Sequence, residues 1–240
     1  ENSIAVLGMV TLDQVEKFLG QVVRDEYGRN LGKLIAVFAD VSGNVEAVEV
    51  AVNDYELVKV EANRIMRAPD ALIVLPEWKA IAIDVENRLD RVKKRIRSLE
   101  ELNRKGMIPA HAYEEMRKKL EAEFKKIKDE SSKLREVLKS KINELDDQII
   151  RYERAIANVY VLYMSNEISE QSYKASMDFM RNAKSKCLDE KRDVEKHLEL
   201  LSKLEAEPVE PQIKAVPPQT QVSTQSQAPI PVVIVEESQH

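Results

Sequence analysis

Short apolar runs, one of them alternating with polar residues, follow one another along the first third of the chain and are typical of β-strands. Residues 45–52 place an apolar side chain at almost every second position, which is typical of a strand with one buried face. Further short strands are predicted at residues 21–24, 31–41, 55–60, 64–67 and 72–75. Turns that contain Gly, Asp or Asn separate several of them. This spacing predicts a small antiparallel β-barrel over residues 1–86.

The period changes to that of an α-helix over residues 87–207. Apolar residues recur there every three or four positions, and the longest uninterrupted run covers residues 110–164. Such a helix is about 80 Å long at ~1.5 Å per residue. A single helix of that length cannot bury its apolar stripe alone. The pattern therefore predicts a coiled coil that forms with a second copy, either in parallel or by folding back near residues 165–168.

The apolar seam of this coiled coil identifies the side chains expected to mediate self-association. They follow one another at intervals of four or seven residues, as heptad positions do. These residues are Leu134, Leu138, Leu145, Ile149 and Ile156.

Two short segments interrupt the helical pattern, at residues 106–109 and 165–168. A tyrosine follows each of them, Tyr113 in the first case and Tyr173 in the second, and the two are 60 positions apart. The coincidence indicates an internal repeat. The alternative, that helix starts resemble one another, remains equally open at this point.

The last segment, residues 208–240, is rich in Pro, Gln, Ser and Thr and is predicted to be disordered. An apolar island lies within it at residues 228–237. An extended apolar peptide of this kind can add a strand to the sheet of a partner, so the island is interpreted as a partner-binding motif. A strand that docks on the chain's own barrel is the alternative. The binding residues would be Ile230, Pro231, Val232, Val233, Ile234 and Val235.

Composition argues against an enzyme. Of the 240 residues 33% are charged and only 5% aromatic, which favours long solvated helices over a large compact core. One cysteine and three scattered histidines exclude a disulfide framework and a cysteine-rich metal site. No Gly-rich phosphate loop, paired-histidine motif or nucleophile elbow occurs. We therefore predict no catalytic residue, no metal or other cofactor, no small-molecule substrate and a cytoplasmic location.

Positive charge is concentrated where the helical pattern begins. Residues 87–105 contain 8 Lys or Arg against 3 Asp or Glu, although the whole chain has a net charge of −5. Such a face can bind the phosphates of DNA or anionic lipid headgroups. The alternative is a solvated face, or one that pairs with acidic helices. The candidate polyanion-binding residues are Arg88, Arg91, Lys93, Lys94, Arg95 and Arg97.

Residues 20–32 resemble the opening of the PRC-barrel domain, whose pattern is Gly-x-x-Val-x-Asp-x-x-Gly-x-x-Ile/Leu-Gly. The matching positions are Gly20, Val23, Asp25, Gly28, Leu31 and Gly32. The local chemistry agrees with the resemblance, since an Asp that starts a turn and a Gly that supplies a positive φ suit a tight connection. The resemblance implies an α+β protein with an N-terminal PRC-type barrel.

The layout of barrel, coiled coil and Pro-flanked Val/Ile peptide resembles the CdvA family of archaeal cell-division proteins. That resemblance implies a self-assembling cytoskeletal scaffold at midcell, associated with DNA or the membrane surface. It also implies that the peptide at residues 230–235 recruits an ESCRT-III-like protein (CdvB) by adding a strand to its winged-helix domain.

Two other functional classes of protein remain open. The first is a nucleic-acid-binding or RNA-processing accessory protein that uses the basic segment 88–105. The second is an ESCRT-III-like subunit itself, since residues 110–206 have the pattern of a long helical hairpin; a barrel in front of that hairpin argues against it.

Overall fold

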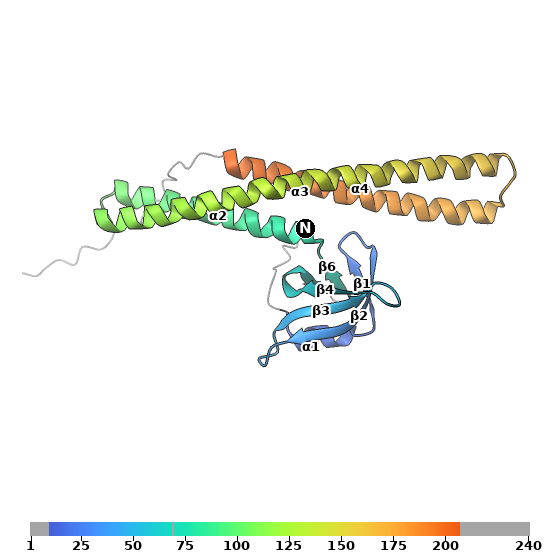
Figure 1. Cartoon of the computed structure of the whole chain (residues 1–240), viewed down its shortest axis with the longest axis horizontal. Coiled ribbons are helices and arrows are strands. Elements are labelled where there is room, and N and C mark those ends of the chain that lie inside the picture. Colours follow the sequence, from blue (N-terminus) through green and yellow to red (C-terminus); the bar gives the residue numbers. More distant parts are fainter. Residues whose placement is uncertain (1–9, 69, 207–240) are drawn as a thin grey trace, which may run out of the picture.

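The computed structural model describes residues 10–68 and 70–206, and it places a small sheet domain against three long helices (Figure 1). The predicted α+β class is confirmed. The sheet domain contains α1 (Leu12–Val15), η1 (Glu16–Phe18), β1 (Val22–Asp25), β2 (Asn30–Ala39), β3 (Val45–Ala51), β4 (Leu57–Glu61), η2 (Ala62–Arg64), β5 (Ile65–Arg67) and β6 (Leu72–Val74). The long helices are α2 (Glu77–Arg104), α3 (Ala110–Met164) and α4 (Glu170–Ala206).

All six predicted strands are present, but the expectation of a purely antiparallel arrangement was wrong. The sheet has the order β4-β3-β2-β1-β6-β5, and β1 pairs with β6 in parallel through Arg24 and Ile73. After β4 the chain crosses to the far side of β1, where Leu72 and Val74 are buried in the same core cluster as Val23. Burial of β6 thus determines the parallel pair, and no local pattern encodes it.

The PRC-like motif forms the turn between β1 and β2. The Asp25 carboxylate accepts a hydrogen bond from the backbone N–H of Arg29 at 2.8 Å, and Gly28 adopts a φ of 75°. Gly32 is required for a different reason. A Cβ at Gly32 would lie 2.1 Å from the carbonyl oxygen of Ala51 on β3, so only glycine lets these strands approach.

Helix α2 begins at Glu77, whereas the sequence pattern placed the start of the helical part at residue 87. Pro76 lies at its N-cap and cannot donate the N–H that a helix start leaves without a partner. From there the buried residues Trp78, Ala82 and Val85 continue the apolar stripe at helical spacing. Ten residues that looked like the end of the barrel domain therefore form the first turns of α2.

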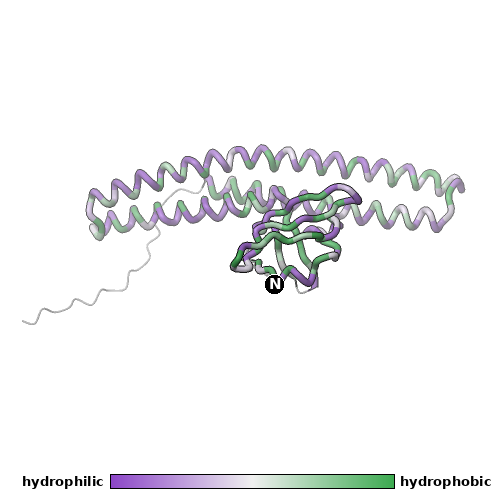
Figure 2. Tube along the Cα trace, turned by 60° about the horizontal axis from the view of Figure 1, so that its bottom comes forward, coloured by the Kyte–Doolittle hydropathy of each residue, from purple (hydrophilic) through white to green (hydrophobic). Residues whose placement is uncertain are grey.

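The helices fold back on one another, which was one of the two predicted arrangements. Helix α3 runs antiparallel to both of its neighbours, so α2 and α4 lie side by side and parallel (Figure 1). Figure 2 shows hydrophilic and hydrophobic residues alternating along each long helix, as amphipathic helices require. Within the described residues, none of the helices has the length and apolarity needed to cross a bilayer.

The two helix–helix turns have the same backbone geometry, 60 residues apart. Gly106 and Asn166 both adopt a positive φ, of 65° and 60°. In each turn the next residue donates its N–H to the carbonyl five residues earlier, that of Leu102 at 3.0 Å and that of Leu162 at 2.9 Å. This is the Schellman pattern of helix C-termini. The shared geometry favours the repeat suggested by the sequence.

The tyrosines that follow the turns have different partners. The Tyr113 hydroxyl lies 2.9 Å from a carboxylate oxygen of Glu100, to which it donates a hydrogen bond. The ring of Tyr173 stacks on that of Tyr163, with centroids 4.2 Å apart. Each tyrosine therefore ties its own helix to the preceding one across the turn.

Candidate functional site

Three of the six basic residues proposed for polyanion binding are taken up by contacts within the chain. Arg88 forms an ion pair with Glu130 on α3, and its hydrogen bond lowers the pKa of the Glu130 carboxyl. Lys93 is 2% exposed and donates a hydrogen bond to the carbonyl of Leu204 on α4. Arg97 is half-buried. These residues join helices and offer little to an external ligand.

The other three, Arg91, Lys94 and Arg95, lie exposed on α2. Lys94 pairs with Asp90 of the preceding turn at 2.6 Å, and both of these side chains are solvated. No carboxylate in the described part of the chain lies within ion-pair distance of Arg91 or Arg95. Of the six candidate residues, only these three are therefore available on α2 to bind a polyanion.

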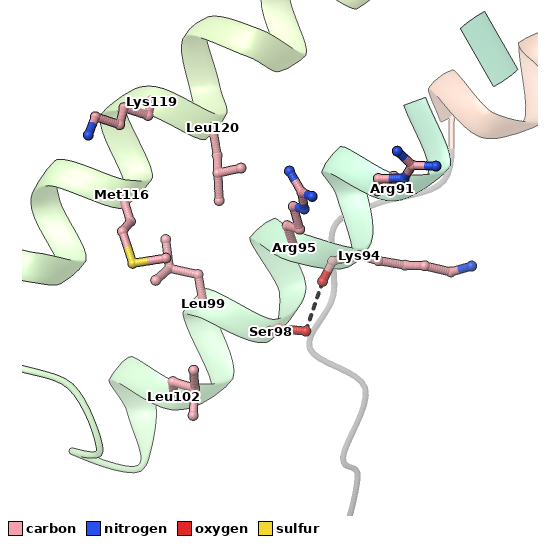
Figure 3. Close-up of a pocket in the computed structure, with 9 residues that line it drawn as sticks. All are labelled: Arg91, Lys94, Arg95, Ser98, Leu99, Leu102, Met116, Lys119 and Leu120. Carbon is pink, nitrogen blue, oxygen red and sulfur yellow. Dashed lines mark hydrogen bonds between the residues drawn. The ribbon is translucent and has the colours of Figure 1, made fainter. Parts of the chain in front are cut away.

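These three residues border a groove of about 530 Å³ between α2 and α3. Its walls are apolar, and Figure 3 shows Leu99 and Met116 pointing toward one another across it. We call it the basic groove; it is lined by Arg91, Lys94, Arg95, Ser98, Leu99, Leu102, Met116, Lys119 and Leu120. Sequence reasoning identified the charges but missed the apolar floor, because α2 and α3 supply it together.

A second charged group joins the sheet domain to α4. Arg29, in the β1–β2 turn, forms ion pairs with Asp25 at 2.5 Å and with Glu190 at 2.6 Å. The Glu190 side chain is only 2% exposed and also accepts a hydrogen bond from the Trp78 indole at 3.0 Å. A carboxylate buried to this degree needs such partners, because leaving its charge unpaired would cost several kcal/mol.

Beside it lies a second set of contacts between the same elements. The Lys79 ammonium contacts Glu26 and Asp193 at 2.5 Å each, and the Tyr27 hydroxyl donates to Asp193 at 2.7 Å. Burial raises the pKa of the Glu26 carboxyl, whereas hydrogen bonds from Lys79 and Tyr27 outweigh burial at Asp193 and lower its pKa. Burial also raises the pKa of the Tyr27 hydroxyl, which therefore acts as a donor.

We call these two sets of contacts the interdomain ionic cluster: Asp25, Glu26, Tyr27, Arg29, Trp78, Lys79, Glu190 and Asp193. Its charges pair across three elements, the β1–β2 turn, α2 and α4. The cluster therefore connects the sheet domain to the helices. In the sequence the Asp25 turn has the pattern of a local feature only. The signal that sequence reasoning missed is the run of charged and aromatic side chains within that turn, which exceeds what a tight turn needs.

The residues proposed for self-association lie in the intrachain core. Four are at most 8% exposed and the fifth is half-buried, and the four belong to one cluster shared by α2, α3 and α4. The four buried residues are Leu134, Leu138, Leu145 and Ile149, and the half-buried residue is Ile156. A second copy reaches these four only if the helical hairpin opens, so their role in self-association stays a prediction.

The described residues contain no group of three or more His, Cys, Asp or Glu side chains arranged to hold a metal ion. Cys187 is buried, and burial raises the pKa of its thiol, which disfavours the reactive thiolate. The peptide at residues 230–235, proposed to bind a partner, lies outside the described residues.

The comparisons with known proteins bear on both the helices and the whole chain. A family model described as a CdvA-like coiled-coil domain matches residues 77–226, and its match begins at the first residue of α2. Cell division protein A of Sulfolobus acidocaldarius is 33% identical to this chain over 201 residues, which make up 84% of each protein. No solved structure matches the chain.

The joint between sheet domain and helices can be tested with Arg29→Ala. This change leaves the Glu190 carboxylate buried without its cation, and we expect the free energy of unfolding to fall by about 3 kcal/mol. The value is at the low end for buried pairs because the Arg29 side chain is 34% exposed. Urea unfolding followed by circular dichroism measures it. Lys174→Ala, which breaks an exposed pair with Glu170, serves as control and should leave the stability nearly unchanged. An equal loss of unfolding free energy in the two variants would contradict a stabilising role for the Arg29–Glu190 pair.

Proposed function

The chain belongs to the CdvA-like coiled-coil family of cell division proteins, and on that basis we propose that it is a non-enzymatic scaffold that recruits an ESCRT-III-like protein to the division site. The observation that carries the proposal is a sheet domain packed against a long helical rod, whose last helix, α4, ends at Ala206 before a tail with an apolar island. We place the scaffold in the cytoplasm at midcell.

Recruitment is assigned to the island at residues 230–235. Prolines that favour extended backbone and consecutive β-branched side chains suit the addition of a strand to a sheet edge on the winged-helix domain of the partner. Because one such peptide binds weakly, a scaffold that carries many copies raises the effective affinity for a polymerising partner.

Calorimetric titration of a peptide covering residues 225–240 against that winged-helix domain tests recruitment. We expect micromolar binding, about −8 kcal/mol, because strand addition combines backbone hydrogen bonds with buried Val and Ile side chains. Val233→Asp with Val235→Asp should abolish it. Gln227→Asp with Ser238→Asp adds the same charge outside the island and should preserve it. A native peptide that shows no heat of binding would remove recruitment from the proposal.

Self-assembly is the second part of the proposal, and the buried seam gives it a specific form. If copies pair through Leu134, Leu138 and the other seam residues, their hairpins must open and exchange helices. Lys184 and Glu153 join α4 to α3 at 2.7 Å, which marks a suitable position for a covalent tether.

We therefore expect a chain with Lys184→Cys, Glu153→Cys and Cys187→Ala to lose self-association once a short bis-maleimide joins the two cysteines. Sedimentation velocity over a range of concentrations measures this, and the same protein without cross-linker is the control. Association that persists after cross-linking would assign it to another surface. A monomer in both states would remove self-assembly from the proposal.

Polyanion binding is a further candidate activity, and with it the alternative class of nucleic-acid-binding accessory protein. The exposed side chains of Arg91, Lys94 and Arg95 support it. DNA and anionic lipid remain the two candidate ligands.

Replacing Arg91, Lys94 and Arg95 by Ala should weaken DNA binding and reduce the slope of log K against log salt by about 2.7 for duplex DNA, since each phosphate contact contributes ~0.9. Fluorescence anisotropy at several salt concentrations measures the slope. A matched variant with Lys125→Ala, Lys128→Ala and Lys133→Ala removes the same charge elsewhere on the helices. Equal slopes in both variants would rule out this surface for DNA, and the same pair tested on anionic vesicles examines the lipid.

A further inference from the structure

The basic groove offers an apolar floor that nothing in the described part of the chain covers. Met116 is 51% exposed, and Leu102 and Leu120 are half-buried. Residues of α2 and α3 alone line the groove, because α4 ends at Ala206. An apolar surface rimmed by positive charge is typical of a docking site.

We propose that residues 228–237 of the same chain fold back into the basic groove. Their consecutive Val and Ile side chains would lie on the floor formed by Leu99, Leu102 and Met116. Glu236 and Glu237, which follow the apolar stretch directly, would meet the arginines at the rim. The rim already has two guanidinium groups, those of Arg91 and Arg95, without an ion pair among the described residues, so this charge match adds to the apolar one.

The dimensions of groove and peptide agree. Along α2 the groove extends from residue 91 to residue 102, which is about 16 Å at ~1.5 Å per residue. An extended stretch of five residues covers the same length at ~3.3 Å per residue. Residues 232–236 comprise that number, four apolar side chains and the first glutamate.

The tether makes docking within one chain favourable. Leu204, in the last turn of α4, contacts Lys93, so the helix ends beside the stretch of α2 that forms the groove. Between Ala206 and the island lie 21 residues, 207–227, and a random coil of that length would have an end-to-end distance of at least ~25 Å. That reach covers the groove and gives an effective concentration near ~1 mM. A second copy fits less well, because the groove has nine lining residues, far fewer than the ~20–30 per partner of a stable interface.

Docking would keep the peptide at residues 232–235 from binding a partner. The side chains at 232–235 cannot occupy the groove and a partner's sheet edge together, and this consequence rests on the proposed function. A groove affinity of ~100 μM would lower the apparent affinity for the partner about tenfold. The docked peptide would also cover Arg91, Lys94 and Arg95, so that a polyanion competes with it and releases the tail.

Double electron–electron resonance on the full-length chain tests the docking without any partner. Spin labels are placed at Lys118→Cys, beside the groove, and at Ser238→Cys, in a chain with Cys187→Ala. We expect a narrow distance distribution that broadens when Leu102→Glu and Met116→Glu place acidic side chains on the floor. Val233→Asp with Val235→Asp, outside the described fold, should broaden it equally. Met107→Glu, exposed but not part of the groove, should leave it narrow.

A distribution that is already broad in the native tail would overturn the proposal. Broadening by the groove variant but not by Val233→Asp with Val235→Asp would overturn the choice of residues 228–237 in favour of another part of the tail. Loss of the narrow distance on dilution with unlabelled chain would identify a second copy as the occupant. A failure to recruit the partner changes none of these distances, so the two proposals can fail separately.

Discussion

The apolar stripe of α3 is the constraint on which the rest of the molecule depends. A helix of 55 residues exposes this stripe along its whole length, and propensity alone does not keep such a helix stable in water. α2 covers one end of it and α4 most of the remainder, so three helices of unequal length share one apolar core. The inequality leaves two stretches with fewer neighbours, the α2–α3 end with its groove and the α3–α4 end.

Ion pairs and hydrogen bonds hold the sheet domain to this rod, together with apolar packing. Trp78 is the main apolar element at the junction, and around it the contacts are ion pairs and hydrogen bonds such as those of Arg29 and Lys79. Buried pairs add little net stability but penalise every arrangement that separates them. These contacts therefore favour one orientation of the sheet domain on the rod.

Sequence patterns predicted the elements well and their tertiary partners poorly. Alternation or short apolar runs between turn residues located every strand, and the two helix breaks followed from Gly106 and Pro109 in the first case and from the polar segment at residues 165–167 in the second. The parallel β1–β6 pair was missed because burial after a crossover decides it. Arg88 and Arg91 look equivalent in the sequence, yet Arg88 is paired with Glu130, 42 residues away, while Arg91 is exposed. The start of α2 was placed too late, because residues 77–86 closely follow a strand, although Pro76 and the helical spacing of Trp78 and Ala82 already indicate a helix.

The helical hairpin beyond the Lys184–Glu153 ion pair contains only α3 and α4, running to the turn at residue 166. Among the described residues, no hydrogen bond or ion pair links this arm to α2 or to the sheet domain, so its length can vary without breaking those contacts. Seven residues added to each of the two helices of the arm would preserve the heptad seam and lengthen the arm by ~10 Å. The length of the arm can therefore change during evolution without disturbing the rest of the fold. Such a change would also alter the spacing of whatever the scaffold arranges.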